Sequence, residues 1–375
     1  MINKNILICA LMLILTSCAQ LGVWEQFLPK NDPKKAEFFH PVWTKNLDPI
    51  SNSGNLPISL SAAAIDDGIV YMGSNQGYFA AYELANGREV WKAMDGSTYH
   101  SSPVIYKDKV IYGTVEGRVI ARNTKNGDEV YYNVDLGASV ETAGTIYNGK
   151  IIFHLRNHQI FCLDIETGKI LWGFKKAISY LTTLQRASRP IVYNNKVFVG
   201  FADGTLGVLG IDEGLLLYEV KISTASKFLD VDANPFIFED KLYIGSQSSP
   251  VMMLDPNSGK IIRTADFTSL RAPIVVNKQL VFGTTNGELV MTDANLVVQK
   301  KIELSKTQMT SLSIFKNSIV AGNLKGKVFA VSTDLNSRIA EFDFGHAYSA
   351  IFSDFDSRED HLVVTSSRNR VFVFN

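Results

Sequence analysis

The segment Val70-Tyr-Met-Gly-Ser-Asn-Gln-Gly-Tyr-Phe-Ala-Ala-Tyr82 decides the fold, because copies of it recur along the whole chain. A second copy is Ile111-Tyr-Gly-Thr-Val-Glu-Gly-Arg-Val-Ile-Ala121. Further copies occupy residues 197–208, 242–253, 280–290, 319–330 and 362–374, and a weaker copy runs over 151–163. The period is roughly 38 to 46 residues, which is typical of the blades of a β-propeller.

Each repeat predicts four short strands. In the second repeat we expect them at 103–106, 110–112, 118–121 and 129–133. Glycine and asparagine in the intervening turns supply the positive φ that tight hairpins need. The strand segments are rich in Val, Ile, Tyr and Phe, and no repeat shows a helical period. The fold class is therefore all-β, with four antiparallel strands in each blade.

The count of repeats predicts how the ring closes. Seven complete units run from about residue 62 to 344, and an eighth begins near Tyr348 but stops at Phe374, three strands in. The missing outer strand appears at the other end of the chain, where Pro41-Val-Trp-Thr-Lys-Asn-Leu47 matches Glu89-Val-Trp-Lys92. We therefore predict an eight-bladed β-propeller in residues 42–375 whose last blade is closed by the N-terminal strand, which leaves no open seam.

A turn glycine is followed four positions later by a large ring near the end of several units. We expect these rings to pack between neighbouring blades, because an aromatic side chain buries about 150–250 Å². In the fifth unit the place after Gly259 is Arg263, which departs from the pattern. The predicted blade-docking residues are Trp43, Trp91, Tyr131, Trp172 and Tyr218.

The first residues predict the compartment. Lys4 precedes an apolar run from residue 6 to 15, which is too short to span a bilayer and is typical of a signal peptide, here 1–17. The ending Leu15-Thr-Ser-Cys18 resembles the bacterial lipobox, in which Cys18 is acylated and anchors the chain. The alternative is a simple secretory signal with an incidental cysteine. Residues 18–41, rich in proline and charge, would be the lipidated cysteine and a tether.

No motif for catalysis or cofactor binding occurs in the chain. The formal net charge is zero, so nothing favours nucleic acid as a partner. Phosphate-binding loops, nucleophile elbows, zinc helices and Cys-x-x-Cys pairs are absent from the sequence. Cys162 lies in an apolar strand and is expected to be a small buried hydrophobe without a disulfide partner. We therefore predict no cofactor, no metal and no enzymatic activity.

Two groups of polar residues invite a different interpretation. His154 and His158 are four apart, but they flank a hairpin turn, so exposed turn histidines are expected and not a metal pair. An acidic cluster lacks the glycine spacing of a calcium loop and is expected to be a solvated loop. Its members are Asp354, Asp356, Glu359 and Asp360.

Two long loops carry the strongest signal for binding. Residues 180–190 and 223–235 each precede the proline that opens an inner strand, so they should be neighbours on one face of the ring. Apolar residues rimmed by charge suit a protein-binding patch. The alternative is internal pairing of Arg186 or Arg189 with Asp230 or Asp232 across adjacent blades, and both can hold. The loops offer Leu181, Leu184, Arg186 and Arg189 on one side, and Phe228, Leu229, Asp230 and Asp232 on the other.

The repeats carry a family resemblance. Asn86-Gly-Arg-Glu-Val-Trp91 and Thr167-Gly-Lys-Ile-Leu-Trp172 resemble the tryptophan-docking motif of PQQ-type propeller repeats. The dehydrogenases built from such repeats carry adjacent cysteines, which this chain lacks. With its lipobox, tether and strand closure, the whole chain resembles the BamB-like lipoproteins of the outer-membrane β-barrel assembly machinery.

The resemblance implies a non-catalytic scaffold anchored in the outer membrane and facing the periplasm. Its partner would be a POTRA domain of the BamA-like barrel-forming subunit, and unfolded outer-membrane proteins could be guided by strand addition. The partner-binding residues would be Leu184, Arg186, Asp230 and Asp232, with Arg186 and Arg189 left as alternatives for the partner-facing arginine. Other functions to weigh are a scaffold of another envelope complex and, further off, a PQQ-type enzyme.

Overall fold

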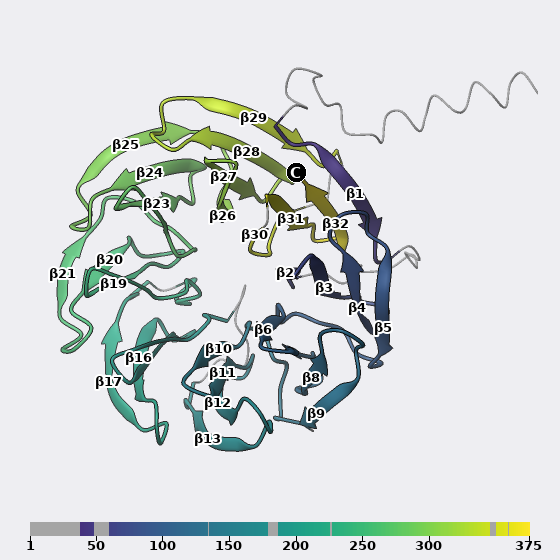
Figure 1. The fold of residues 1–375 in the computed structure, drawn as a ribbon. Coiled ribbons are helices and arrows are strands. Elements are labelled where there is room, and N and C mark those ends of the chain that lie inside the picture. Colours follow the sequence, from purple (N-terminus) through teal and green to yellow (C-terminus); the bar gives the residue numbers. More distant parts are fainter. Residues whose placement is uncertain are drawn as a thin grey trace, which may run out of the picture.

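The computed structural model describes residues 38–48, 60–133, 135–178, 187–225, 227–345, 350–358 and 360–375. These residues form eight four-stranded antiparallel sheets arranged as blades around an axis (Figure 1). The predicted all-β, eight-bladed propeller is confirmed. No helix among the described residues is long and apolar enough to cross a membrane.

Along the chain, each blade begins with its innermost strand and proceeds outward. Blades one to four are β2 Ala64–Asp66, β3 Ile69–Gly73, β4 Tyr78–Glu83 and β5 Glu89–Met94; β6 Val104–Tyr106, β7 Lys109–Gly113, β8 Val119–Asn123 and β9 Glu129–Asn133; β10 Thr145–Tyr147, β11 Lys150–His154, β12 Gln159–Asp164 and β13 Ile170–Lys175; β14 Ile191–Tyr193, β15 Lys196–Gly200, β16 Thr205–Gly210 and β17 Leu216–Lys221. Blades five to seven are β18 Phe236–Phe238, β19 Lys241–Ile244, β20 Met252–Leu254 and β21 Ile261–Thr264; β22 Ile274–Val276, β23 Gln279–Gly283, β24 Glu288–Thr292 and β25 Val298–Glu303; β26 Met309–Phe315, β27 Ser318–Asn323, β28 Lys327–Ser332 and β29 Arg338–Asp343. Blade eight is β30 Asp356–Arg358, β31 His361–Thr365 and β32 Arg370–Phe374, completed by β1 Pro41–Asn46.

The N-terminal strand closes the ring as predicted. β1 runs antiparallel to β32, with Pro41 opposite Phe374 and Asn46 opposite Arg370. In Figure 1 the purple β1 lies beside the yellow β32 at the seam. Because this pairing joins the two ends of the chain, every blade has four strands and the seam exposes no unpaired strand.

The core is divided among the seams between blades. Buried apolar side chains of adjacent blades pack together at each seam, as Ile152 and Cys162 of blade three do with Val199 and Leu209 of blade four. Cys162 is fully buried and free, as expected for a small hydrophobe. Each blade is a sheet that is apolar on both faces, so it is stable only between two neighbours.

The predicted docking rings lie against the turn glycine of the following blade. Trp91 donates its indole N–H to the carbonyl of Thr124 at 2.8 Å and covers Gly127. A β-carbon at Gly127 would lie 2.6 Å from Trp91 Cε3, and the residue has φ +75°, so glycine fits there for two separate reasons. The same ring-on-glycine contact recurs for Trp43 on Gly87, Tyr131 on Gly168, Trp172 on Gly214 and Tyr218 on Gly259.

At two seams the ring is missing, and a leucine in the turn of the following blade fills the space. Where Arg263 of blade five stands in the ring position, the facing turn of blade six carries Leu296, which has φ +58° and is 3% exposed. Lys300 of blade six is matched in the same way by Leu335 of blade seven, with φ +55° and 4% exposure. A leucine in the left-handed region is uncommon, and here it occupies apolar space that no ring fills.

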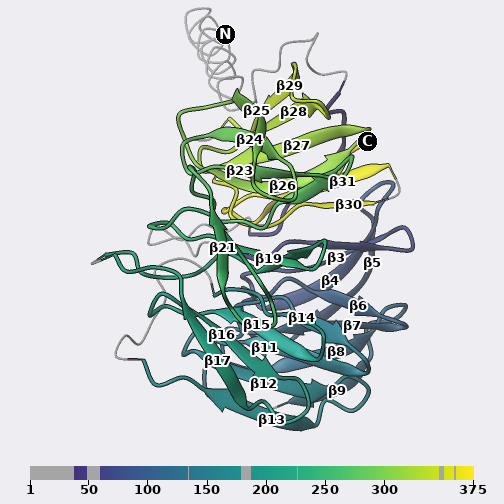
Figure 2. The same ribbon diagram turned by 90° about the vertical axis from the view of Figure 1, so that its left-hand side faces the viewer.

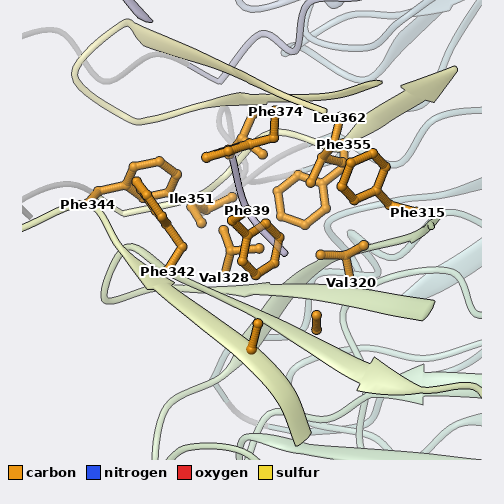
Figure 3. Close-up of a cluster of buried hydrophobic side chains, with 13 residues drawn as sticks. Phe39, Phe315, Val320, Val328, Phe342, Phe344, Ile351, Phe355, Leu362 and Phe374 are labelled. Carbon is orange, nitrogen blue, oxygen red and sulfur yellow. The ribbon is translucent and has the colours of Figure 1, made fainter. Parts of the chain in front are cut away.

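Phe39 fills the last of these positions. Blade seven has Ala340 in the ring position, and Phe39 lies in the same buried cluster, 1% exposed (Figure 3). Its ring centre is 5.6 Å from that of Phe374 and 6.4 Å from that of Phe342. Phe38 and Phe39, which the sequence assigns to the tether, therefore belong to the packing of the ring.

One expectation about the acidic cluster is wrong. Asp356 is not in a solvated loop but opens the inner strand β30, and its carboxylate accepts a 2.7 Å hydrogen bond from the Ile65 N–H of blade one. Burial raises the pKa of Asp356. The inner strands of adjacent blades lie close to the axis, so a carboxylate there can bond to the backbone of the neighbouring blade. Glu359 lies outside the described residues.

Candidate partner-binding surface

The connections between blades lie on one face of the ring, which we call the loop face. Antiparallel order places the turns between the second and third strands of each blade on this face as well. Of the predicted binding residues, Asp230 and Asp232 are described, whereas Leu184 and Arg186 lie outside the described residues, as does Cys18. The geometry below therefore concerns residues 187–190 at the end of the first loop and nearly all of the second.

The ends of the two loops are joined to each other. Ser188 donates its hydroxyl to the Ala233 carbonyl at 2.9 Å and accepts a bond from the Gly200 N–H at 3.1 Å. The N–H of Arg189 is bonded to the Asn234 side-chain oxygen at 2.8 Å. The described ends of the loops before blades four and five are thus neighbours on the loop face.

These bonds belong to a series of hydroxyl contacts near the axis. Ser61 donates to the Ser101 carbonyl at 3.0 Å, and Ser101 donates to the Thr142 carbonyl at 2.8 Å. Each donor stands just before an inner strand and reaches the equivalent residue of the following blade. The ends of the two candidate loops are therefore fixed by the same kind of contact that holds other blades in register.

Arg189 is engaged by blade three. Its guanidinium donates to the Gly144 carbonyl at 2.8 Å and to the Thr145 hydroxyl at 3.3 Å. The side chain is half-buried. Arg189 therefore ties the end of its loop to the preceding blade.

The two aspartates of the second loop differ in exposure. Asp230 is half-buried, whereas Asp232 is 4% exposed. Between them Val231 is buried and donates its N–H to the Phe201 carbonyl at 3.1 Å. A carboxylate can contact a partner only where it reaches the surface, so Asp230 suits a direct contact and Asp232 suits a role in holding the loop.

The second loop also carries an apolar residue at its surface. Phe228 is 56% exposed and has φ +55°. A left-handed conformation costs a non-glycine residue about 1–2 kcal/mol. The sequence marks Phe228 as one of several apolar loop residues, but no sequence pattern reveals its backbone conformation.

The expectation of exposed turn histidines is wrong. His154 is fully buried and His158 is 2% exposed, with ring centres 6.3 Å apart. His154 lies at the end of β11 on the loop face, where Nδ1 donates to the Ser188 carbonyl at 2.8 Å, and its ring packs edge-on against Phe201. A histidine beside this turn is exposed in an isolated hairpin, but here Ser188 and Phe201 of blade four cover His154.

Burial determines the charge state of His154. It lowers the pKa of His154 from 6.5 to about 4, outweighing the bond to Ser188 that acts in the opposite direction. The neutral ring donates through Nδ1, and Nε2 has no hydrogen-bond partner within the described residues. Those residues contain no group of three or more His, Cys, Asp or Glu side chains that could hold a metal ion. The histidine therefore supports the end of the first loop as a neutral group.

The geometry defines the class of protein as an eight-bladed propeller of PQQ-like repeats that is closed by its N-terminal strand. On its loop face, the ends of the loops before blades four and five are joined. A family model described as outer membrane protein assembly factor BamB matches residues 40–132 and 129–300. Since these matches span most of the chain, the protein belongs to that family.

Individual relatives agree with this placement. A curated BamB of Shewanella oneidensis is 21% identical over 394 residues, covering 99% of this chain and 98% of the relative. A BamB of Yersinia pestis is 25% identical over 284 residues, with 70% of each chain covered. The crystal structure of BamB from Moraxella catarrhalis superposes with a TM-score of 0.73 at 18% identity, covering 90% of this chain and 99% of that one. At this identity the structural likeness supports the fold, and the family model supports the membership.

Proposed function

We propose that this protein is a non-catalytic scaffold of the outer-membrane β-barrel assembly machinery, and that it binds a POTRA domain of the barrel-forming subunit through its loop face. The observation that carries the proposal is the pair of neighbouring loops before blades four and five, joined through Ser188 and Ala233. The partner-binding residues would be Leu184, Arg186 and Asp230, with Asp232 holding the second loop. A lipid on Cys18 would anchor the chain in the outer membrane, facing the periplasm.

Charge reversal tests the surface. Recovery of the barrel-forming subunit with the detergent-solubilised lipoprotein should be lost in Asp230→Lys. The matched control is Asp266→Lys, an exposed aspartate in the equivalent loop before blade six, which should leave recovery unchanged. If wild-type protein recovers another envelope complex and no assembly subunit, the proposal is wrong. If Asp230→Lys recovers as much subunit as wild type, Asp230 is not part of the contact.

A second part of the proposal concerns unfolded outer-membrane proteins, which could pair with the outer edge of a blade. The outer strands of blades three to five are β13, β17 and β21 (Figure 2). Apolar side chains are exposed at the start of each of these strands. The first residue of the outer strand is a glutamate in blades one and two, Glu89 and Glu129, so the repeat does not require an apolar residue at this position. The second residue is an exposed valine in both blades, where blades three to five carry a larger leucine or isoleucine. The exposed apolar residues are Ile170, Leu171, Leu215, Leu216, Leu217, Ile261 and Ile262.

Crosslinking tests this second part separately. A photoreactive residue at Leu217 should capture an unfolded outer-membrane protein, whereas the same residue at Val90 of blade one should not. Equal capture at both positions would contradict a specific role for blades three to five.

A further inference from the structure

Phe228 is the one phenylalanine of the described residues whose side chain is mainly in solvent. Its exposed fraction is 56%, whereas the other described phenylalanines are buried or half-buried. It lies two residues before Asp230, on the loop that the proposed function assigns to the partner. Large aromatic rings in the centre of a charged rim are the side chains that contribute most to protein–protein affinity.

The backbone at Phe228 is held in place by neighbouring side chains. Its carbonyl accepts a 2.7 Å bond from the Ser248 hydroxyl, which is itself 2.7 Å from the Ser223 hydroxyl. The next residue, Leu229, packs against Gly204, where a β-carbon would lie 3.3 Å from Leu229 Cδ2. The ring is therefore presented by a fixed segment, which reduces the entropy lost on binding.

The backbone conformation of Phe228 does not suit its side chain. With φ +55°, the position favours glycine or asparagine, and a bulky residue there is strained. The ring gains little within the chain to offset this strain, because more than half of it is exposed. Backbone strain that internal packing does not offset indicates a functional role.

We propose that Phe228 is the apolar anchor of the partner-binding surface. Its ring inserts into an apolar pocket of the POTRA domain, and basic groups beside that pocket meet Asp230. This inference rests on the proposed function, since it names the residue that supplies affinity at that site. It predicts a side chain that is important for binding and unfavourable for folding.

The test compares affinity with stability in the same variants. Full-length lipoprotein in detergent is titrated with the purified barrel-forming subunit, and Tm is measured alongside. Phe228→Gly should weaken binding at least tenfold while leaving Tm unchanged or higher, because glycine tolerates positive φ. Phe228→Leu should retain part of the affinity. Met94→Ser, a control at a 69% exposed residue at the end of β5 in blade one, should bind as wild type.

The outcomes separate this inference from the proposed function. If Asp230→Lys abolishes binding and Phe228→Gly binds as wild type, the anchor is refuted and the proposed function stands. If wild-type protein fails to bind the subunit, both are overturned. A marked fall in Tm for Phe228→Gly would show that the ring serves the fold, which also contradicts the inference.

Discussion

Single residues show how one contact type fixes five seams of the ring. A turn glycine and a ring belong to adjacent blades, so the sequence pairing of Gly127 with Tyr131 within one unit hides the actual contact of Gly127 with Trp91. The contact needs both the absence of a β-carbon and a positive φ, and these two requirements can be tested apart.

Gly127→Ala should destabilise the protein more than Gly149→Ala. The two glycines have nearly the same φ, +75° and +74°, but a β-carbon at Gly149 meets nothing within 4 Å. The control therefore measures backbone strain alone, about 1–2 kcal/mol. In Gly127→Ala the clash of the new β-carbon with the Trp91 ring should add about 1–3 kcal/mol to this loss of stability, as overpacking does. Urea unfolding checks the difference, and equal losses would refute the ring contact.

His154 should make stability fall in mild acid. Its pKa is about 4 in the folded chain and near 6.5 when unfolded, so the unfolded state binds more protons between these values. The stabilisation is complete above pH 6.5 and declines as pH falls towards 4, by about 3 kcal/mol in all. The advantage of wild type over His154→Gln, measured by urea unfolding, should shrink across this range. A constant difference would contradict a neutral buried ring.

At the level of strands and loops, the sequence predicts most of the architecture. Nearly every strand can be located from the repeat spacing and the turn glycines. The closure of the ring follows from the match of Val42 and Trp43 to an outer strand. The seams between blades five and eight could not be predicted. Leu296 and Leu335 have the positive φ of the turn glycines in other blades, and a side chain fits there because no ring faces the turn. No local pattern records what the neighbouring blade lacks.

Phe39 should stabilise the closing seam. Truncating a buried phenylalanine typically costs about 3–5 kcal/mol, and Phe39→Ala should fall in this range because it empties the space beside Ala340. Phe38→Ala is the matched control, since Phe38 is only half-buried, and should cost less. Chemical denaturation gives both values. Protease cleavage before β1 should also accelerate in Phe39→Ala, and equal resistance of the two variants would argue against this role.

The candidate site was only partly predictable for a related reason. Asp-Val-Asp at 230–232 identifies the loop, but not that Asp232 is buried while Asp230 reaches the surface. Buried His154 was missed because hairpin turns are usually exposed, and its cover comes from Ser188 of another blade. Contacts between repeats depend on the ring, and a single repeat carries no information about them.

For the whole molecule, the ring and the proposed lipid anchor occupy separate parts of the chain. The described chain enters the ring at Phe38, and everything proposed for Cys18 lies before that point. Cys18→Ser should move the protein from the outer-membrane fraction to the soluble periplasm while its Tm stays that of wild type. Fractionation with mass measurement of the N-terminal peptide checks both. Wild-type protein found in the outer-membrane fraction with an unmodified Cys18 would contradict lipid anchoring.

The most direct test of the proposed scaffold is crosslinking in living cells from position 230. A photoreactive amino acid replacing Asp230 should form an adduct whose peptides map to a POTRA domain of the barrel-forming subunit. The same substitution at Met94, which is 69% exposed in blade one, should form none. Adducts from position 230 to an unrelated envelope protein, with none to the assembly subunit, would contradict the proposal.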